Sequence, residues 1–481
     1  MELVTKKAMK CIQEADVIVY DNLIDISLLN YASLNTELIY AGKEAANHYL
    51  SQGSIIELLM DKAREGKYVV RLKGGDPYLF GRGSEEALAL KEAGISYEIV
   101  SGVTSSIAVP AYAGIPVTDR RFVSSCHIIT AHREDEAGID FENISKLEGT
   151  LVFMMGLAKL HHIVQGLTLH SKASDTPVAV LSDGSRYNRR KCVGTLADIE
   201  EKVKEAKLLP PAIIVVGEVV SLSNELDNFL EKYSDKKLFR KKILLTGTRY
   251  ICNKIKVALA DEGCDIDEIS IIESVPIESD FYNNIEKYIE SHDYLVFSSA
   301  NGIRVFFEKL KELHNVDLRK LSNIKFAVIG KGSAQTLRNY GYIADFVPSS
   351  FSNKDLAVEL CKQLKGEKLL LLRAREASAE LVEELEANKV EYTDVPLYET
   401  FRDYRRTFDI KRLIKNYDYV VVASSITAHT LCEMVEDKAL LEGRVVSIGP
   451  VTTGTCKRLG VEPLMSAREY SVDGIVRVLL Q

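Results

Sequence analysis

Asp293-Tyr-Leu-Val-Phe-Ser-Ser299 and Asp418-Tyr-Val-Val-Val-Ala-Ser-Ser425 repeat one pattern, and this repeat decides the fold of the second half of the chain. Each copy is an apolar run, typical of a strand buried in a parallel sheet, followed by serines that can begin a helix. A second matched pair, 328–341 and 447–460, carries Ile-Gly followed by small and hydroxyl residues. We therefore predict two similar lobes.

Both pairs place hydroxyl groups and free backbone N–H groups at the carboxyl ends of strands. Helix N-termini bind anions, and open α/β sheets bind their ligands at this edge. Two such edges facing each other would form a cleft suited to a ligand with several carboxylates. Helix capping alone explains any single turn, but it is a weaker explanation for four turns in two matched pairs.

The composition of the chain is that of a globular protein with several domains. It has 481 residues, of which 46% are apolar and 27% charged, and a net charge of −8 argues against a nucleic-acid binder. The eight cysteines contain no CxxC pair, so we expect no metal site and no disulfides. Because the sequence has neither a membrane-spanning apolar run nor a signal peptide, we expect a cytoplasmic protein that does not contact membranes.

The first half alternates short apolar runs with amphipathic stretches such as Ser54–Glu65, which is an α/β pattern. The runs are Val17–Tyr20, Tyr68–Arg71, Thr150–Phe153 and Ala212–Val216. A polar stretch follows at Asn224–Lys237, and the alternation restarts at Lys242. The main boundary is therefore predicted near residue 235, within a solvated linker at 227–239.

A glycine-rich loop is the strongest local signal of the first half. It reads Val70-Arg-Leu-Lys-Gly-Gly-Asp-Pro-Tyr-Leu-Phe-Gly-Arg-Gly83, and glycines there let backbone approach a ligand closely. Ser101-Gly-Val-Thr-Ser-Ser106 and the Ala-Tyr-Ala-Gly-Ile-Pro segment within 109–120 follow it. With these motifs, residues 1–226 resemble the uroporphyrinogen-III C-methyltransferases of the tetrapyrrole methylase family.

The resemblance implies transfer of two methyl groups from S-adenosylmethionine to uroporphyrinogen III, which gives precorrin-2 on the route to sirohaem or cobalamin. It also implies a homodimer through this half. Asp21 matches the family's proton acceptor and Lys43 its proton donor, although a turn residue and a surface charge are the plainer interpretations. The residues implied to bind S-adenosylmethionine are Gly74, Gly75, Asp76, Leu79, Thr104, Ser105, Met155 and Gly184.

The sequence departs from this family at its beginning. Family members open with a strand and a Gly-x-Gly-Pro-Gly-Asp-Pro loop, whereas here Met1 falls where that loop would end and a helix is predicted over Leu3–Glu14. The first strand would lie inside a parallel sheet. We therefore expect its absence to leave backbone groups of the neighbouring strands unpaired and to remove one wall of the donor pocket.

Residues 240–481 resemble uroporphyrinogen-III synthase. The motifs that carry the resemblance are Phe297–Gly302, Val395–Thr400, Val422–Thr427 and Ile448–Thr453. The family's architecture implies an α/β fold with parallel sheets in two lobes. Lobe one would comprise 240–275 with 400–481, and lobe two 276–399.

The implied reaction removes the hydroxyl of hydroxymethylbilane and closes the ring through a spiro intermediate that inverts the last pyrrole. Positioning matters more here than strong acid–base chemistry. Tyr398 matches the family's tyrosine and is the candidate for assisting hydroxyl departure, but a half-buried strand aromatic explains it equally well. The residues predicted to bind carboxylates are Ser299, Asn301, Ser424, Ser425, Thr427 and Thr452.

The leading hypothesis is a bifunctional enzyme that makes uroporphyrinogen III and then methylates it. A second hypothesis keeps only the synthase, beside an inactive methyltransferase half. A third is a non-catalytic module that binds tetrapyrrole carboxylates, because two α/β lobes around a cleft also describe ligand-sensing proteins.

Overall fold

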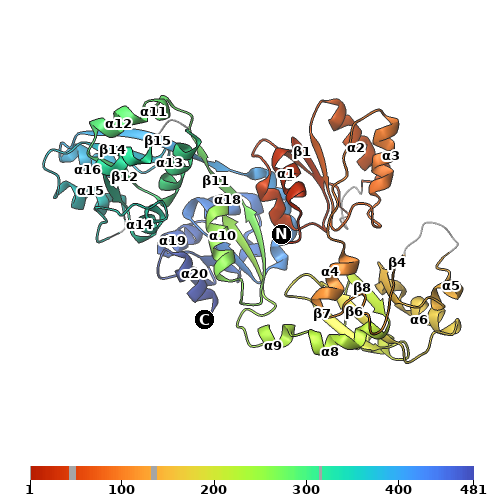
Figure 1. The fold of residues 1–481 in the computed structure, drawn as a ribbon. Helices are drawn as coiled ribbons and strands as arrows, with labels where there is room; N and C mark the ends of the chain where they lie inside the picture. Colours follow the sequence, from red (N-terminus) through yellow and green to blue (C-terminus); the bar gives the residue numbers. More distant parts are fainter. Residues whose placement is uncertain (1, 43–49, 132–137, 314–316, 351) are drawn as a thin grey trace.

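The structure, a computed structural model, describes residues 2–42, 50–131, 138–313, 317–350 and 352–481. Within these residues the strands form four sheets, two in each half of the chain. Figure 1 shows the sheet of β9 and β10 in the middle, between the red-to-yellow lobes of the first half and the teal lobe of the second. The chain is an α/β protein with two two-lobed halves, as predicted, and its sheets are mixed as well as parallel.

The first lobe contains a parallel sheet in the order β2-β1-β3. Alternate side chains of a strand point to opposite faces, so Val17 and Val19 of β1 pack under α2, while Ile18 and Tyr20 face the second half of the chain. The elements are α1 (Lys6–Glu14), β1 (Val17–Tyr20), η1 (Ile26–Tyr31), β2 (Glu37–Tyr40), α2 (Gln52–Arg64), β3 (Val69–Leu72) and α3 (Gly83–Glu92).

The outer edge of β3 is open in the part of the chain that the structure describes. There β3 pairs with β1 alone, and the segment 95–100, which follows α3, belongs to no strand. A strand edge of this kind keeps unpaired backbone N–H and C=O groups.

The second lobe contains a mixed sheet in the order β4-β5-β8-β6-β7. Because β8 is antiparallel to both β5 and β6, the carboxyl ends of β5 and β6 lie at one edge. The strands are β4 (Cys126–Thr130), β5 (Thr150–Met154), β6 (Pro177–Ser182), β7 (Arg190–Thr195) and β8 (Ala212–Val216). The helices are α4 (Ser105–Tyr112), α5 (Phe141–Ser145), α6 (Leu160–Leu169), α7 (Ile199–Glu205), α8 (Ser223–Leu226) and α9 (Phe229–Tyr233).

Lobe one of the second half is built from both ends of that half, in the parallel order β10-β9-β16-β17-β18. Its strands are β9 (Lys242–Gly247), β10 (Asp265–Ser270), β16 (Tyr419–Val422), β17 (Val445–Ser447) and β18 (Met465–Ser466). Its helices are α10 (Arg249–Ala258), α17 (Thr407–Leu413), α18 (Ser425–Val435), α19 (Pro450–Arg458) and α20 (Val472–Leu479), with the turn η5 (Tyr404–Arg406) before α17.

Lobe two has the sheet order β11-β15-β14-β12-β13, parallel except for β11. The antiparallel pair β11 and β15 also connects the two lobes. The strands are β11 (Ile272–Pro276), β12 (Tyr294–Phe297), β13 (Lys325–Val328), β14 (Leu369–Ala374) and β15 (Tyr392–Arg402). The helices are α11 (Asp280–Asn283), α12 (Ile285–Ser291), α13 (Ala300–Glu312), α14 (Lys331–Arg338), α15 (Asn353–Cys361) and α16 (Glu380–Ala387).

The segment 227–239 is less solvated than a linker. Phe229 and Leu238 are buried, and the guanidinium of Arg189 lies 3.7 Å from the centre of the Phe229 ring. Lysines surround these apolar residues in the sequence, and for this reason the stretch is predicted to be a solvated linker although it is packed. Among the described residues, no helix is both long and apolar enough to cross a membrane.

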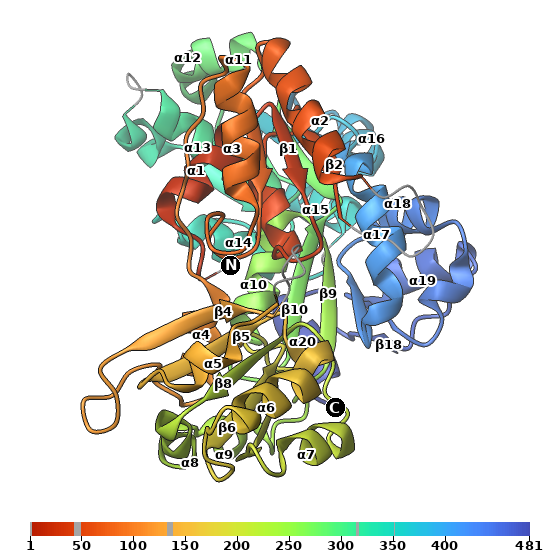
Figure 2. The same ribbon diagram turned by 90° about the vertical axis from the view of Figure 1, so that its right-hand side faces the viewer.

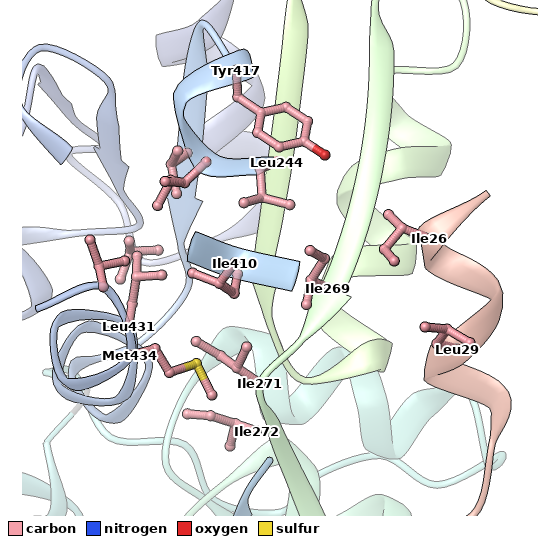
Figure 3. Close-up of a cluster of buried hydrophobic side chains, with 14 of the residues drawn as sticks. Ile26, Leu29, Leu244, Ile269, Ile271, Ile272, Ile410, Tyr417, Leu431 and Met434 are labelled. Atoms are coloured by element: carbon pink, nitrogen blue, oxygen red, sulfur yellow. The ribbon is translucent and has the colours of Figure 1, made fainter. Parts of the chain in front are cut away.

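One apolar core joins the two halves of the chain. It contains Ile18 and Tyr20 of β1 and Ile26 and Leu29 of η1, together with strands and helices of lobe one. Figure 3 shows Ile26 and Leu29 across from Ile269, with Ile410 of α17 beyond. Figure 2 shows α17 beside β2, where ring contacts add to the core. The halves are therefore packed together and not merely tethered.

Candidate active sites

The glycine-rich loop after β3 is packed so closely that several positions have no room for a side chain. A Cβ on Gly74 would lie 2.8 Å from the carbonyl oxygen of Leu23, and one on Gly102 would lie 2.3 Å from that of Gly75. Gly75 itself has φ +79°, which favours glycine. Close backbone packing therefore explains the glycines, and it leaves the backbone of Gly74 and Gly75 exposed.

The carboxylate of Asp76 holds this loop to the next one. Its Oδ1 accepts from the backbone N–H of Tyr78 at 2.9 Å, and its Oδ2 accepts from that of Gly102 at 3.1 Å. The N–H of Leu79 donates to the carbonyl of Asp76 at 3.2 Å. In this structure Asp76 shapes the candidate cofactor site, and its side-chain oxygens are already engaged.

The other candidate cofactor residues lie around α4 and at one edge of the second sheet. Thr104 caps α4, and Ser105 is the first residue of that helix. A Cβ on Gly184 would lie 2.2 Å from the Val109 side chain of α4, so this loop packs on the helix. Met155 follows β5 with φ +55° and is 50% exposed. Since the ends of β5 and β6 share an edge, Met155 and Gly184 lie on the same side of the sheet.

Asp21 lies in a network of ionic side chains at the end of β1. Its Oδ2 is 3.1 Å from a guanidinium nitrogen of Arg71, and its Oδ1 accepts from the N–H of Leu23 at 2.9 Å. Glu86, which is buried, pairs with both Arg71 at 3.4 Å and Lys73 at 3.2 Å. Burial, and after it the charge of Arg71, lowers the pKa of Lys73. The other predicted acid–base residue, Lys43, lies outside the described residues.

Tyr398 and Ser299 meet at the junction of the synthase-like lobes. Their side-chain oxygens are 2.9 Å apart, and Ser299 also caps α13 by accepting from the N–H of Gly302 at 3.0 Å. Tyr398 is only 5% exposed, and burial raises the pKa of its phenol. The phenol therefore stays protonated near neutral pH and can donate a hydrogen bond.

Asn301 and Arg304 lie one turn apart on α13, and Arg304 reaches Tyr250 of lobe one. The amide of Asn301 donates to Ser274 Oγ of β11 at 3.0 Å, and Arg304 lies 3.5 Å from the amide oxygen of Asn301. The Arg304 guanidinium stacks 4.0 Å above the ring of Tyr250 in α10. Its buried Nε has no hydrogen-bond partner among the residues that the structure describes. A cation thus stands between the lobes with part of its hydrogen-bonding capacity unused.

Three of the candidate residues of lobe one form hydrogen bonds within that lobe. Ser424 caps α18 by accepting from the N–H of Thr427 at 3.1 Å, and the hydroxyl of Thr455 donates to Ser425 at 3.0 Å. The side chains of Thr427 and Thr452 are each 1% exposed. Helix capping and one bond between α18 and α19 account for these contacts, so carboxylate binding by this group stays a prediction that rests on the backbone N–H groups at the helix ends.

Comparison with known proteins agrees with this division. Residues 1–200 match the family model described as tetrapyrrole (corrin/porphyrin) methylases, and 253–477 match uroporphyrinogen-III synthase HemD. The porphyrin biosynthesis protein HemD of Ruminiclostridium josui is 34% identical over 100% of this chain and 95% of its own length. The chain is a tetrapyrrole methylase fused to a uroporphyrinogen-III synthase.

The methylase half has closer relatives still. Uroporphyrinogen-III C-methyltransferase of Methanocaldococcus jannaschii is 49% identical over 46% of this chain and 92% of its own length. The S-adenosyl-L-methionine-dependent uroporphyrinogen III methyltransferase of Methanosarcina barkeri is 49% identical over 47% of this chain and 89% of its own. Both halves therefore belong to families of tetrapyrrole biosynthesis enzymes.

Several site residues could not be predicted as such from the sequence. In the methylase half they are Arg71, Lys73 and Glu86, and the alternation Arg-Leu-Lys does place the first two on one face of a strand. In the synthase half they are Tyr250 and Arg304, which come from different lobes. No local pattern marks that pair, because their contact depends on how the lobes meet.

Proposed function

We propose that this chain catalyses two consecutive steps of tetrapyrrole synthesis. The synthase half would close hydroxymethylbilane to uroporphyrinogen III with inversion of the last ring. The methylase half would then transfer two methyl groups from S-adenosylmethionine to that product, giving precorrin-2. The observation that carries the proposal is the pairing, along one chain, of a synthase family with a family whose relatives methylate uroporphyrinogen III.

In the synthase step the protein's task is to fold the linear substrate for closure. Tyr398, held by Ser299, donates a hydrogen bond to the departing hydroxyl, since burial keeps its phenol protonated. Arg304 and the N-termini of α13 and α18 supply positive charge to the substrate's carboxylates. These contacts favour the inverted ring by orientation, while most of the reactivity belongs to the substrate.

In the methylase step the candidate residues fit a ligand held largely by backbone. Gly74 and Gly75 expose their main chain, and Met155 exposes an apolar side chain on the other lobe. S-adenosylmethionine, when bound, supplies an activated methyl group. Asp21, fixed by Arg71 and by the N–H of Leu23, accepts the proton that the macrocycle releases elsewhere when a pyrrole carbon is methylated.

The decisive experiment supplies the purified chain with hydroxymethylbilane and S-adenosylmethionine, followed by chromatography and mass spectrometry of the tetrapyrroles. Type III product carrying two added methyl groups is expected. Type I product alone would refute the synthase assignment. Unmethylated type III product, also when uroporphyrinogen III is supplied directly, would refute the methylase assignment.

The open edge of β3 favours a second candidate, a synthase beside an inactive methylase. In this case the unpaired strand and the segment 95–100 would leave the cofactor site incomplete. Calorimetry with S-adenosylhomocysteine separates the bifunctional enzyme from the synthase with an inactive methylase, because an incomplete cofactor site should not bind this ligand. We also keep a homodimer through the methylase half and a cytoplasmic location as predictions, testable by light scattering and cell fractionation.

A further inference from the structure

The turn η5 and helix α17 of the synthase half are anchored in the first lobe of the methylase half. Arg406, 1% exposed, donates to the amide oxygen of Asn30 at 2.6 Å and to the carbonyl of Ile26 at 3.2 Å. Arg405 donates to the carbonyls of Ser33 and Thr36 at 2.8 and 2.7 Å. Both arginines thus satisfy backbone carbonyls of the loop between β1 and β2.

The last residue of β1 is bonded directly to the synthase half. The hydroxyl of Tyr20 donates to the two carboxylate oxygens of Asp409 at 3.0 and 3.1 Å. Asp409 is fully buried and paired with Arg406 at 3.1 Å. Burial, followed by the charge of Asp409, raises the pKa of Tyr20, so its hydroxyl remains a donor. Since Asp21 is the next residue, this bond holds the strand end from which Asp21 extends.

A second contact reaches the other lobe of the methylase. Asp265, at the amino end of β10, accepts from the backbone N–H groups of Tyr187 and Asn188 at 2.8 and 3.1 Å. Arg186 lies 3.4 Å from Asp267 of the same strand. These residues belong to the loop that follows β6, which also contains Gly184. The synthase half therefore holds a second loop that carries a candidate cofactor residue.

We propose that the synthase half positions the methylase active site, with Asp409 acting on Asp21 through Tyr20 and Asp265 acting on the loop of Gly184. This inference rests on the proposed methyltransferase function. Two independent contacts, on different methylase lobes, each end within four residues of a candidate site residue. Asp265 stands at the amino end of its strand, opposite the carboxyl ends near which the candidate synthase residues of lobe one lie, so the two roles are spatially separate.

The test compares three variants of the full chain: Asp409→Asn, Tyr20→Phe and Asp265→Asn. Methylation is measured on uroporphyrinogen III and S-adenosylmethionine supplied directly, and ring closure is measured separately with hydroxymethylbilane. Asparagine has one acceptor oxygen and no charge, so Asp265→Asn loses one of the two bonds to the loop and leaves the other without charge assistance. We expect this variant to raise the KM for S-adenosylmethionine about tenfold. Asp409→Asn and Tyr20→Phe should lower kcat about tenfold with that KM little changed.

Asp418→Asn is the matched control. Asp418 also lies at the amino end of a strand region of lobe one, and it accepts from the backbone N–H of Lys242 at 2.8 Å and from Lys241. Among the described residues it has no hydrogen bond or ion pair with the methylase half, so its replacement should leave methylation unchanged. Ring closure should stay within about twofold of the wild type in all four variants, because none of these residues is a candidate site residue of the synthase half.

The outcomes are distinguishable. Unchanged methylation in all three variants would overturn the inference. It would also be overturned if kcat fell in proportion to the melting temperature in every variant, without the KM of Asp265→Asn and the kcat of the other two changing separately. Tyr20→Phe removes only one hydroxyl group, so it still tests the bond between Tyr20 and Asp409 if the Asp409→Asn variant fails to fold. A wild-type chain that neither binds S-adenosylhomocysteine nor methylates would overturn the proposed methyltransferase function together with this inference.

Discussion

The phenolic oxygen of Tyr398 and the hydroxyl oxygen of Ser299 lie 2.9 Å apart, and this bond links the strand that connects the two synthase lobes to the N-terminus of α13. Ser299 thus both caps α13 and orients the phenol of Tyr398. Because α13 begins there, its positive end and a protonated phenol lie beside each other. The pair is therefore suited to a substrate that carries carboxylates and must lose a hydroxyl.

Replacing Tyr398 with phenylalanine should slow ring closure by about 100-fold, the loss typical of a general acid. The ring stays in place, so the fold should be retained. Tyr294→Phe is the control, because Tyr294 is another buried tyrosine of the same sheet with no proposed role. The rate of type III product over the spontaneous type I background is the measurement. A Tyr398→Phe rate within twofold of the wild type would leave this residue as an ordinary strand aromatic.

Arg304→Gln should raise the KM for hydroxymethylbilane about tenfold or more, because the cation between the lobes is lost while the chemistry at Tyr398 is not. Arg304→Lys should recover only part of the affinity, since an ammonium cannot stack on Tyr250 as a planar guanidinium does. Arg338→Gln, on the exposed side of α14 in the same lobe, is the control. Equal KM values for Arg304→Gln and the control would exclude a binding role.

The repeat in the sequence predicts a large part of the synthase half. The runs at 293–299 and 418–425 form strands β12 and β16, and both are followed by a serine that caps the next helix. Apolar runs and capping residues act locally, so sequence alone reveals them. In the methylase half, the predicted run Val17–Tyr20 is strand β1 with the same bounds.

Contacts between lobes are what the sequence could not predict. Tyr20 and Asp409 are 389 residues apart, and neither stands in a motif that suggests a partner. The apolar residues Ile410 and Ile414 of α17 and the following turn look like the inner face of any helix, but they pack in a core shared with the methylase. The buried Phe229 was likewise hidden in a charged stretch. Hydrophobic periodicity shows that one face of a helix is buried, but only the three-dimensional structure shows which residues bury it.

Gly74→Ala should weaken binding of S-adenosylhomocysteine by about tenfold or more. The added Cβ would meet the carbonyl oxygen and carbon of Leu23 at 2.8 and 3.3 Å, and rigid backbone cannot move aside as a side-chain end can. Gly53→Ala is the control, because a Cβ there meets only Ser51 Oγ at 3.7 Å. Isothermal titration calorimetry measures both. Wild-type affinity in Gly74→Ala would show that the loop can shift to make room for a Cβ. It would also show that close packing against Leu23 does not require glycine at this position.

The stability of the whole chain should depend on pH through Glu268, a buried residue at the interface between the halves. Its backbone N–H donates to Ser27 Oγ at 2.8 Å, and its carbonyl accepts from Asn30 at 2.9 Å. Burial is the main cause that raises the pKa of its carboxyl from 4.5 to about 7. The folded chain therefore retains this proton between these two pH values, whereas the unfolded chain has released it.

Unfolding then releases a proton in this range, so the free energy of unfolding should fall as pH rises from about 4.5 to about 7 and level off above. Glu268→Gln cannot ionise and should lose this dependence, which makes it the more stable chain by up to about 3 kcal/mol at pH 8 but not at pH 4.5. Urea unfolding from pH 5 to pH 8 measures the difference. Glu391→Gln, which alters an exposed ion pair with Lys368, is the control. A constant difference between Glu268→Gln and the wild type across this range would mean that Glu268 is already ionised in the folded chain at pH 5, and that water or nearby cations reach it at the interface.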